Sequence, residues 1–272
     1  DIDESHSPSD FFSFVDKTIT QCRQLKLKKF ELNSTYAIQF ESLVNRWIRF
    51  AINCNVEELN IIIWTKEMEA VFVLDELFFN SSSFTHLRLK DCILNPMSAI
   101  SWNKLTSLSI SYAKLDEDLI QNILSGSPLL ETLKLDHCYG YRRLDITSKS
   151  VKNLVICAYM DPTLENIALM IEINAPNIMS IAIHSILYLR KLVLPNVSSL
   201  VRANLNYFNM PHLLSSEEEE EMLKGLILSF CLAKELTIGK FCHEVKFPLY
   251  YASSNLINLT LNNQKIKTKL TT

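Results

Sequence analysis

Two pairs of neighbouring residues could take part in metal or thiol chemistry: His137–Cys138 and Cys242–His243. Imidazole nitrogens and thiolates bind zinc, and a cysteine with a lowered pKa beside a basic group can act as a nucleophile. Adjacent residues of a strand point to opposite faces, however, so neither pair can hold one ion alone. No further cluster of ligands stands near either pair in the sequence. We interpret these residues as structural and expect neither a metal nor a cofactor.

Other patterns of catalytic residues are also missing from the sequence. The seven cysteines include no C-x-x-C pair, and no serine lies in a G-x-S-x-G turn. With only four glycines the chain has no glycine-rich loop that could bind a phosphate. The carboxylates of Asp116 and Asp118 fall at the expected start of a helix, where capping accounts for them. We therefore expect that the chain is not an enzyme.

The composition is that of an ordinary globular protein, with 48% hydrophobic and 21% charged residues. A net charge of −3 is too small to favour a nucleic-acid or membrane partner. No apolar run approaches the roughly 18 residues of a membrane span, and the acidic start is unlike a signal peptide. The odd number of cysteines favours reduced thiols. We expect the protein in the cytoplasm, the nucleus or both.

A repeat explains where most of these residues lie. The pattern apolar-x-x-apolar-x-apolar recurs along the chain, and its last apolar positions alternate as in a short strand with one buried face. From Leu59 to Ile181 the fourth positions are 28, 21, 25, 21 and 27 residues apart, within the roughly 20 to 29 residues of one leucine-rich repeat. The matching segments are 22–27, 56–61, 84–89, 105–110, 130–135, 151–156, 178–183, 233–238 and 256–261.

A second set of matches, 141–146, 168–173 and 189–194, falls about half a repeat out of phase with the first. These segments predict that some repeats, which we also call coils, contain a second strand on the wall opposite the main strands, where other repeats have a helix. We expect an α/β leucine-rich-repeat solenoid with irregular repeats, with short parallel strands on its concave wall and mixed strands and helices on its convex wall. Cys92 and Cys138 follow their strands where such a repeat turns and buries a small side chain.

Four segments have the periodicity of amphipathic helices, 9–24, 41–53, 116–126 and 217–230. Phe14 is expected on the apolar stripe of the first. We expect one solenoid over residues 1–272, with a helix-rich N-terminal coil over 1–55 and a helix with terminal coils over 215–272. The stretch 195–216 is harder to assign: residues 201–205 alternate like a strand, and the chain after Tyr207 resembles a loop.

Three stretches carry a resemblance to a known family: SLVNRWIRFAINCNVEELNI, LDEDLIQNILSGSPLLETLKLDHCYGYRRLDITSKSVKNLVI and INAPNIMSIAI. They resemble plant F-box/leucine-rich-repeat proteins, in particular those with an FBD region. The resemblance runs from about Phe14 to at least Asn206. This chain has Ser127 where the family usually has a cysteine, and the F-box that normally precedes the repeats is not present in it.

The resemblance implies a non-catalytic substrate receptor of an SCF-type ubiquitin ligase. Its partners would be a protein substrate, held by the repeat domain, and a Skp-type adaptor and cullin, reached through the F-box that this chain lacks. One alternative is a stand-alone repeat scaffold. Another is a receptor gated by a small molecule or polyanion in a pocket on the concave wall.

The alternation of the strands predicts which side chains face a partner. Those of the first half are mainly basic and would suit an acidic or phosphorylated peptide, since ammonium and guanidinium groups form charge-assisted bonds with such anions. Among the tryptophans, Trp47 and Trp102 are expected in the core and Trp64 as an exposed aromatic anchor. The candidate substrate-binding residues on the concave wall are Lys26, Lys28, Arg88, Lys90, Lys134, Asp136 and His184.

Overall fold

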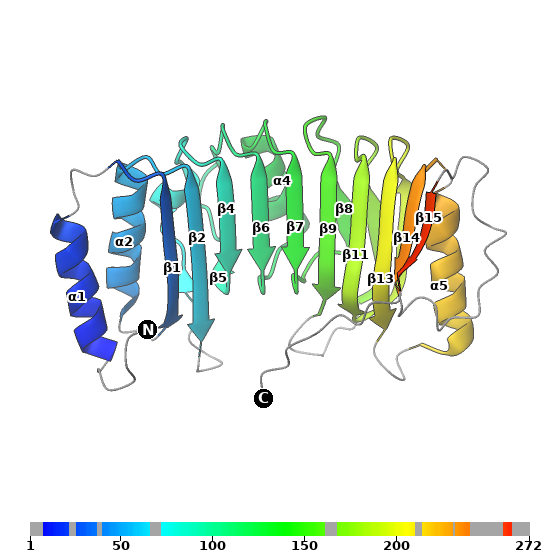
Figure 1. Ribbon diagram of the computed structural model, residues 1–272, viewed down its shortest axis with the longest axis horizontal. Coiled ribbons are helices and arrows are strands. Elements are labelled where there is room, and N and C mark those ends of the chain that lie inside the picture. Colours follow the sequence, from blue (N-terminus) through cyan, green and yellow to red (C-terminus); the bar gives the residue numbers. More distant parts are fainter. Residues whose placement is uncertain are drawn as a thin grey trace. The chain divides into compact units, whose positions relative to one another are not determined.

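The computed structural model describes residues 8–21, 26–36, 40–65, 72–160, 168–209, 214–230, 232–239 and 258–262. The chain divides into two compact units. The first comprises Asp1–Ala113 and Ser125–Leu130, and the second comprises Lys114–Leu124 and Glu131–Thr272. Within each unit the main strands run parallel to one another, as Figure 1 shows. The expected α/β class of short parallel strands is confirmed, whereas one solenoid over the whole chain stays a prediction.

Among its described residues the first unit contains four main strands in the order β1-β2-β4-β6, a small sheet of β3 and β5, three helices and the end of a fourth, α4. Its elements are α1 (Pro8–Gln21), β1 (Lys29–Tyr36), α2 (Glu41–Asn53), β2 (Glu58–Thr65), β3 (Phe72–Val73), α3 (Glu76–Phe79), β4 (His86–Lys90), β5 (Cys92–Ile93) and β6 (Ser107–Ser111).

In the part of the second unit that the structure describes, six main strands lie in the order β7-β9-β11-β13-β14-β15, and a second sheet has the order β12-β10-β8. Its elements are the first residues of α4 (Glu117–Gly126), β7 (Thr132–Asp136), β8 (Arg143–Asp145), β9 (Asn153–Tyr159), β10 (Ala168–Asn174), β11 (Ser180–Leu187), β12 (Leu189–Asn196), β13 (Arg202–Asn209), α5 (Ser216–Ser229), β14 (Glu235–Gly239) and β15 (Asn258–Asn262).

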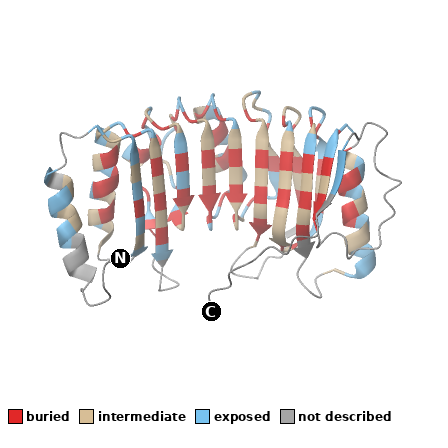
Figure 2. Ribbon diagram, viewed as in Figure 1, coloured by how far each residue is buried: buried red, intermediate tan, exposed pale blue. Residues whose placement is uncertain are grey.

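The predicted apolar positions of the repeat form ladders across neighbouring strands. In the first unit Leu59, Leu87 and Leu108 are partners in register, and all three are buried. The residues between them are more exposed, which gives the alternating bands of Figure 2. Burial of one such side chain contributes about 1.5–3 kcal/mol, so each added strand extends the core by about two such contributions. The repeat positions predicted from Leu59 to Ile181 are confirmed, whereas Leu259, in the predicted repeat 256–261, is 39% exposed.

An aromatic cluster fills the first unit behind its strands. Phe78, Phe79, Phe84 and Trp102 are fully buried, and the ring centroids of Phe78 and Trp102 lie 5.6 Å apart in an edge-to-face arrangement. The Trp102 indole N–H donates to the carbonyl oxygen of Phe78 at 3.1 Å, so burial leaves no polar group of this ring unpaired. The predicted core position of Trp102 is confirmed, as is that of Trp47.

The second sheet confirms the out-of-phase set of repeats in the second unit. Leu144 of β8 pairs in register with Ile173 of β10, and Ile171 pairs with Leu192 of β12. All four side chains are buried, so extended chain does replace helix in these coils. Helix α5 packs against β12 and begins with a capping box formed by Ser215 and Glu218.

Each main strand from β4 to β11 has the same backbone irregularity at one position of the repeat. A positive φ, between 51° and 67°, occurs at Asp91, Tyr112, His137, Ala158 and Ser185. This residue directly follows β4, β6 and β7 and lies within β9 and β11. The amide of the turn residue reaches the following coil: in the first unit Asp91 donates to Ser111, and in the second His137 donates to Cys157. The predicted turn residues Cys92 and Cys138 are buried directly after this position.

The N-terminal part of the chain differs from the sequence-based prediction. The first strand is KFELNSTY, and its buried residue Leu32 pairs with Ile61, whereas residues 26 and 27 of the predicted strand over 22–27 lie outside any strand. Helix α1 ends at Gln21, and residues 22–25 lie outside the described residues. Phe14 is 63% exposed and does not lie in the core. The elements β3, α3 and β5 are too short to produce a readable period.

None of the described helices is both long enough and apolar enough to cross a lipid bilayer.

Candidate protein-binding face

We call the buried apolar repeat positions of each main strand, such as Leu87 and Leu89 in β4, its rungs. The residues that alternate with the rungs form what we call the open face of the main strands. In the first unit one row of this face consists of Glu31, Asn60, Arg88 and Ser109, which are partners in register. A second row, two residues further along each strand, consists of Asn33, Ile62, Lys90 and Ser111. Parallel pairing in exact register therefore places side chains from distant repeats beside one another.

The basic character of this face is narrower than the sequence suggested. Lys26 and Lys28 precede β1, so they do not belong to either row, and the ammonium group of Lys28 lies 3.4 Å from the carboxylate of Glu57. The position in register with Arg88 and Asn60 is Glu31. The expectation for Lys26 and Lys28 was wrong because Leu25 and Leu27 imitate the repeat pattern a few residues before the true strand.

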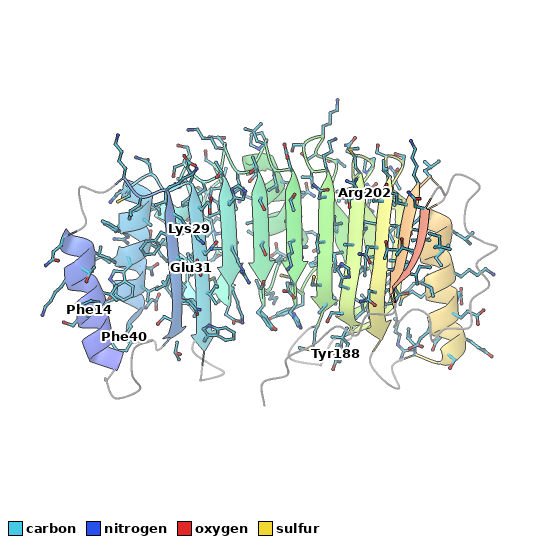
Figure 3. All side chains as sticks on the ribbon, viewed as in Figure 1. Phe14, Lys29, Glu31, Phe40, Tyr188 and Arg202 are labelled. Atoms are coloured by element: carbon cyan, nitrogen blue, oxygen red, sulfur yellow. The ribbon has the colours of Figure 1, made fainter. Side chains whose placement is uncertain are left out.

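Glu31 is largely neutralised by its neighbours. Lys29 lies on the same strand, where Figure 3 labels both residues, and its ammonium nitrogen is 3.0 Å from Glu31 Oε2. Asn60 Nδ2 donates to the same oxygen at 3.4 Å. These two bonds, Lys29 first, lower the pKa of the Glu31 carboxyl. Arg88 is exposed and forms no ion pair within the described part of the chain.

Trp64 and Lys90 form a defined cluster at the end of this face. The Trp64 side chain is 49% exposed, as expected of an aromatic anchor, and its indole N–H donates to Asn33 Oδ1 at 2.7 Å. The Lys90 ammonium nitrogen lies 3.2 Å from the centroid of the Trp64 ring and 5.0 Å from that of Tyr112. Cation–π contacts of this kind contribute about 0.5–2 kcal/mol and fix the position of the charge. We call Trp64, Arg88, Lys90 and Tyr112 the aromatic–cation cluster.

The open face of the second unit has a different chemistry. Asp136, Cys157 and His184 are consecutive partners in register on β7, β9 and β11. Burial lowers the pKa of His184, and the charge of Lys134 lowers it further. Burial also raises the pKa of the Cys157 thiol, which disfavours the reactive thiolate. The structure thus brings together the predicted residues Lys134, Asp136 and His184, around a centre that is neutral at physiological pH.

The His137–Cys138 pair has structural roles. His137 occupies the left-handed turn position, with Nδ1 2.7 Å from Asp136 Oδ1. Cys138 is fully buried, and its thiol donates to the carbonyl oxygen of Asp136 at 3.6 Å. Within the described ranges, no three His, Cys, Asp or Glu side chains gather as they would around a metal. The pair Cys242–His243 lies outside the described residues.

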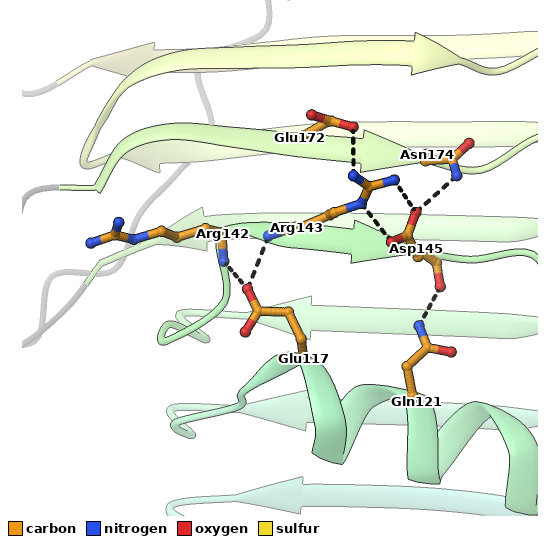
Figure 4. A network of polar contacts seen from close by, with 7 residues as sticks. All are labelled: Glu117, Gln121, Arg142, Arg143, Asp145, Glu172 and Asn174. Atoms are coloured by element: carbon orange, nitrogen blue, oxygen red, sulfur yellow. Dashed lines mark hydrogen bonds and ion pairs between the residues drawn. The ribbon is translucent and has the colours of Figure 1, made fainter.

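A polar network on the second sheet of the second unit escaped the sequence-based prediction (Figure 4). Arg143 Nε donates to Asp145 Oδ2 at 2.6 Å, and its Nη1 lies 3.6 Å from Glu172. Asn174 Nδ2 donates to Asp145 Oδ1 at 2.8 Å. The bond from Arg143 and then that from Asn174 lower the pKa of Asp145. These residues occupy alternate positions on β8 and β10, a signal that is readable only once the register is known.

Helix α4 joins this network through its first two turns. Glu117 Oε1 accepts the backbone N–H groups of Arg142 and Arg143 at 2.7 and 3.2 Å. Gln121 Nε2 donates to the carbonyl oxygen of Asp145 at 2.8 Å. The network thus attaches α4 to β8. Its acceptors and donors are used within the unit, so we assign it to stability rather than to binding.

Strands with two buried rungs that recur at intervals of 21 to 28 residues, with a positive φ at the same position of successive repeats, define a leucine-rich-repeat protein. The family model described as "At1g61320/AtMIF1, LRR domain" matches residues 18–216. The chain belongs to this family, the leucine-rich-repeat domains of plant F-box/LRR-repeat proteins.

Three relatives from Arabidopsis thaliana illustrate the similarity. F-box protein At5g03100 is 28% identical over 236 residues, which are 83% of this chain and 71% of that protein. The putative F-box/LRR-repeat protein At3g18150 is 34% identical over 71% of this chain and 40% of its own length. F-box/LRR-repeat protein At5g02910 is 32% identical over 71% of this chain and 41% of its own length. No solved structure is similar enough to the chain to count as a match.

Proposed function

We propose that this chain is the substrate-recognition domain of an SCF-type ubiquitin ligase and binds a protein substrate on the open face of its main strands, the concave wall of a single solenoid. The observation that carries the proposal is the register of that face, which presents aligned side chains from successive repeats. A surface of this kind suits an extended protein segment. The receptor itself contributes no catalytic group.

The connection to a ligase rests on the relatives. Both At3g18150 and At5g02910 are named as F-box/LRR-repeat proteins, and the chain spans less than half the length of each. In this proposal an F-box elsewhere in the natural protein binds a Skp-type adaptor, the adaptor binds a cullin, and the repeat domain holds the substrate nearby. Holding the substrate raises its local concentration at the ligase, which operates in the cytoplasm or the nucleus.

The decisive experiment uses the full natural protein expressed in plant cells. We expect it to co-purify with a Skp-type adaptor and a cullin, and we expect its targets to accumulate when its gene is deleted. A variant with Arg88 and Lys90 both changed to Met should retain the adaptor and lose targets. A full-length protein that binds no adaptor contradicts the ligase role and leaves the stand-alone scaffold. A small molecule retained in native mass spectra would indicate the ligand-gated receptor.

A further inference from the structure

We propose that the aromatic–cation cluster of the first unit binds an extended acidic or phosphorylated peptide segment, with Arg88 and Lys90 each holding one anionic side chain. This inference rests on the proposed function, because it names the class of substrate segment that the open face takes. It replaces the wide basic strip expected from the sequence with one defined site.

The Lys90 ammonium group is held in place before any partner arrives. One side of it lies 3.2 Å from the centre of the Trp64 ring, and Tyr112 flanks it at 5.0 Å. The Trp64 ring is in turn fixed by its hydrogen bond to Asn33, 2.7 Å long. A free lysine loses considerable side-chain entropy when it binds an anion. Because Lys90 has already been positioned, an incoming carboxylate or phosphate meets a smaller entropic cost.

The charges around the cluster favour an anion over a cation. Lys90 already occupies one face of the Trp64 ring, and its positive charge repels a partner's lysine or arginine there. Arg88 lies two residues away on the same strand and face, without an ion pair in the described ranges. Glu31, the acidic residue of the same row, is bound to Lys29 and Asn60. Partial burial raises the pKa of the Asp91 carboxyl, and the charge of the neighbouring Lys90 lowers it.

The spacing of the two cations favours an extended peptide. Residues i and i+2 of a strand are about 6.6–6.8 Å apart and point to the same face. An extended peptide has the same period, so acidic side chains at alternate positions can reach Arg88 and Lys90 together. The exposed part of the Trp64 ring can then pack against a neighbouring apolar side chain, which a free phosphate ion cannot provide. We therefore expect a peptide with two anionic side chains at i and i+2 next to an apolar one.

Trp64 is the natural probe for this site, since Trp47 and Trp102 are fully buried. Before peptide is added, iodide should quench the tryptophan emission more strongly than caesium does, because iodide is attracted to Lys90 and Arg88. Addition of a short peptide with glutamates at alternate positions and one leucine should change the emission and protect it from iodide. The same peptide with glutamines should do neither. A phosphoserine version tests whether phosphorylation strengthens binding.

Four variants separate a specific site from general attraction. Lys90→Met and Arg88→Met should each weaken binding of the acidic peptide about tenfold, the effect of losing one charge-assisted hydrogen bond. Trp64→Phe abolishes the fluorescent signal, so its binding is followed by calorimetry; it should weaken the peptide with leucine more than one with serine in its place. The matched control is Lys104→Met, which removes an exposed lysine from the same unit outside the open face. Circular dichroism confirms that each variant is folded.

Three results would overturn the proposal: equal binding of the glutamine peptide, an equal loss in Lys104→Met, or displacement of the peptide by inorganic phosphate at peptide-like concentrations. A failure here is distinguishable from a failure of the proposed function. If the full natural protein with Lys90→Met still captures the wild-type targets and the adaptor, the acidic-peptide site is wrong and the receptor role stands. If wild-type chain binds the peptide but no adaptor is recovered, the site stands and the ligase role falls.

Discussion

The two units share one construction and differ in what they display. In both, buried leucine and isoleucine rungs alternate with open-face positions, as with Leu87 and Leu89 in β4 and Ile181 and Ile183 in β11. The open face of the first unit contains the aromatic–cation cluster. At the corresponding positions of β9 and β11 the second unit has Val155, Cys157, Ala182 and His184.

This difference shows how a repeat fold separates stability from recognition. The rung positions contribute burial and are restricted to residues of similar size and polarity. The open-face positions contribute little to the core, so their side chains can change without loss of the fold. The rungs are therefore alike in the two units, whereas the open-face residues of β4 are charged and those of β9 and β11 are largely neutral.

The units also differ behind their main strands. The first unit fills this space with the aromatic cluster around Trp102, and among its described residues the second sheet consists of the two-residue strands β3 and β5. The second unit has longer strands there, held by the polar network around Asp145. The stability of the first unit thus relies on ring packing, which does not depend on pH. That of the second relies partly on carboxylates, whose contribution does depend on pH.

The largest loss of folding stability is expected from substitutions at the rungs. Leu89→Ala in the first unit and Ile183→Ala in the second should each cost about 2–5 kcal/mol, because both side chains are fully buried. Arg88→Ala, on the same strand as Leu89, should cost at most about 0.5 kcal/mol. Urea denaturation followed by circular dichroism measures all three. An equal loss in Arg88→Ala would remove the distinction between rungs and open face.

A smaller effect is expected from the polar network of the second unit. Asp145→Asn removes the charge-assisted bonds from Arg143, and we expect a loss of about 1 kcal/mol at neutral pH, since the pair is partly exposed to solvent. The pKa of Asp145 is lowered in the folded state, so its contribution is present above the unfolded pKa, about 3.9, and is lost as the pH falls below it. The variant should therefore lose less stability than the wild type between pH 5 and pH 3, both chosen as about one unit to either side of that value. Unfolding curves at the two pH values test this, with Lys149→Met as an exposed control on the same unit.

The sequence predicts features that produce a local pattern along the chain, and it does not predict features that depend on the pairing of two distant segments. The rungs were predictable because hydrophobic burial imposes a period that survives in one sequence, and so were the positions of Arg88, Lys90 and the exposed Trp64. The first strand was placed too early, because Leu25 and Leu27 satisfy the same pattern and only pairing with β2 decides between the two registers. Pairing in register is a property of two segments and has no local signature.

The side-chain contacts of the site were beyond the sequence for a similar reason. Lys90 and Trp64 are 26 positions apart by their numbers in the chain, and nothing local indicates that one lies over the other. The network of Arg143, Asp145 and Asn174 likewise depends on the register of β8 and β10. The alternation in the sequence predicts which side chains share the open face, and the structure gives the geometry of the contacts between them.

A buried serine offers a small gain of stability in the first unit. The Ser127 side chain is buried, and its Oγ has no hydrogen-bond partner among the described residues. By contrast, the thiol of Cys92 donates to the carbonyl oxygen of Lys90 at 3.3 Å. Cysteine is the residue that the family resemblance indicates for this position. Ser127→Cys should stabilise the chain by roughly 0.5–1 kcal/mol, because burial without a hydrogen bond costs a thiol less free energy than it costs a hydroxyl.

Ser127→Ala is the control for this substitution, since it removes the hydroxyl without adding sulfur. It should also be stabilising, by less than Ser127→Cys, because the smaller side chain leaves space unfilled. Thermal unfolding under reducing conditions compares the three proteins. A loss of stability in both variants would show that the hydroxyl has a partner that these contacts do not include.

The smallest expected effect concerns the charge of the second unit's open face. Because burial and the charge of Lys134 lower the pKa of His184, the folded chain releases a proton that the unfolded chain still holds. Stability should therefore decrease as the pH falls through the unfolded value of about 6.5, and the decrease should level off below the folded pKa. Down to that lower pKa the His184 position of the open face stays uncharged, unlike the corresponding position of the first unit, Lys90. His184→Gln should flatten the pH dependence of stability between about pH 7.5 and 5.5, one unit to either side of the unfolded value.

Lys134→Met supplies the matching test, because removal of that charge should move the His184 pKa back toward its ordinary value without touching the imidazole. Titration of the His184 ring protons by NMR measures both proteins directly. A wild-type pKa at or above 6.5 would mean that the imidazole is solvated and that the second unit gains charge in mild acid. Its open face would then approach the first unit's affinity for anions at low pH, and the comparison between the two surfaces would hold only near neutrality.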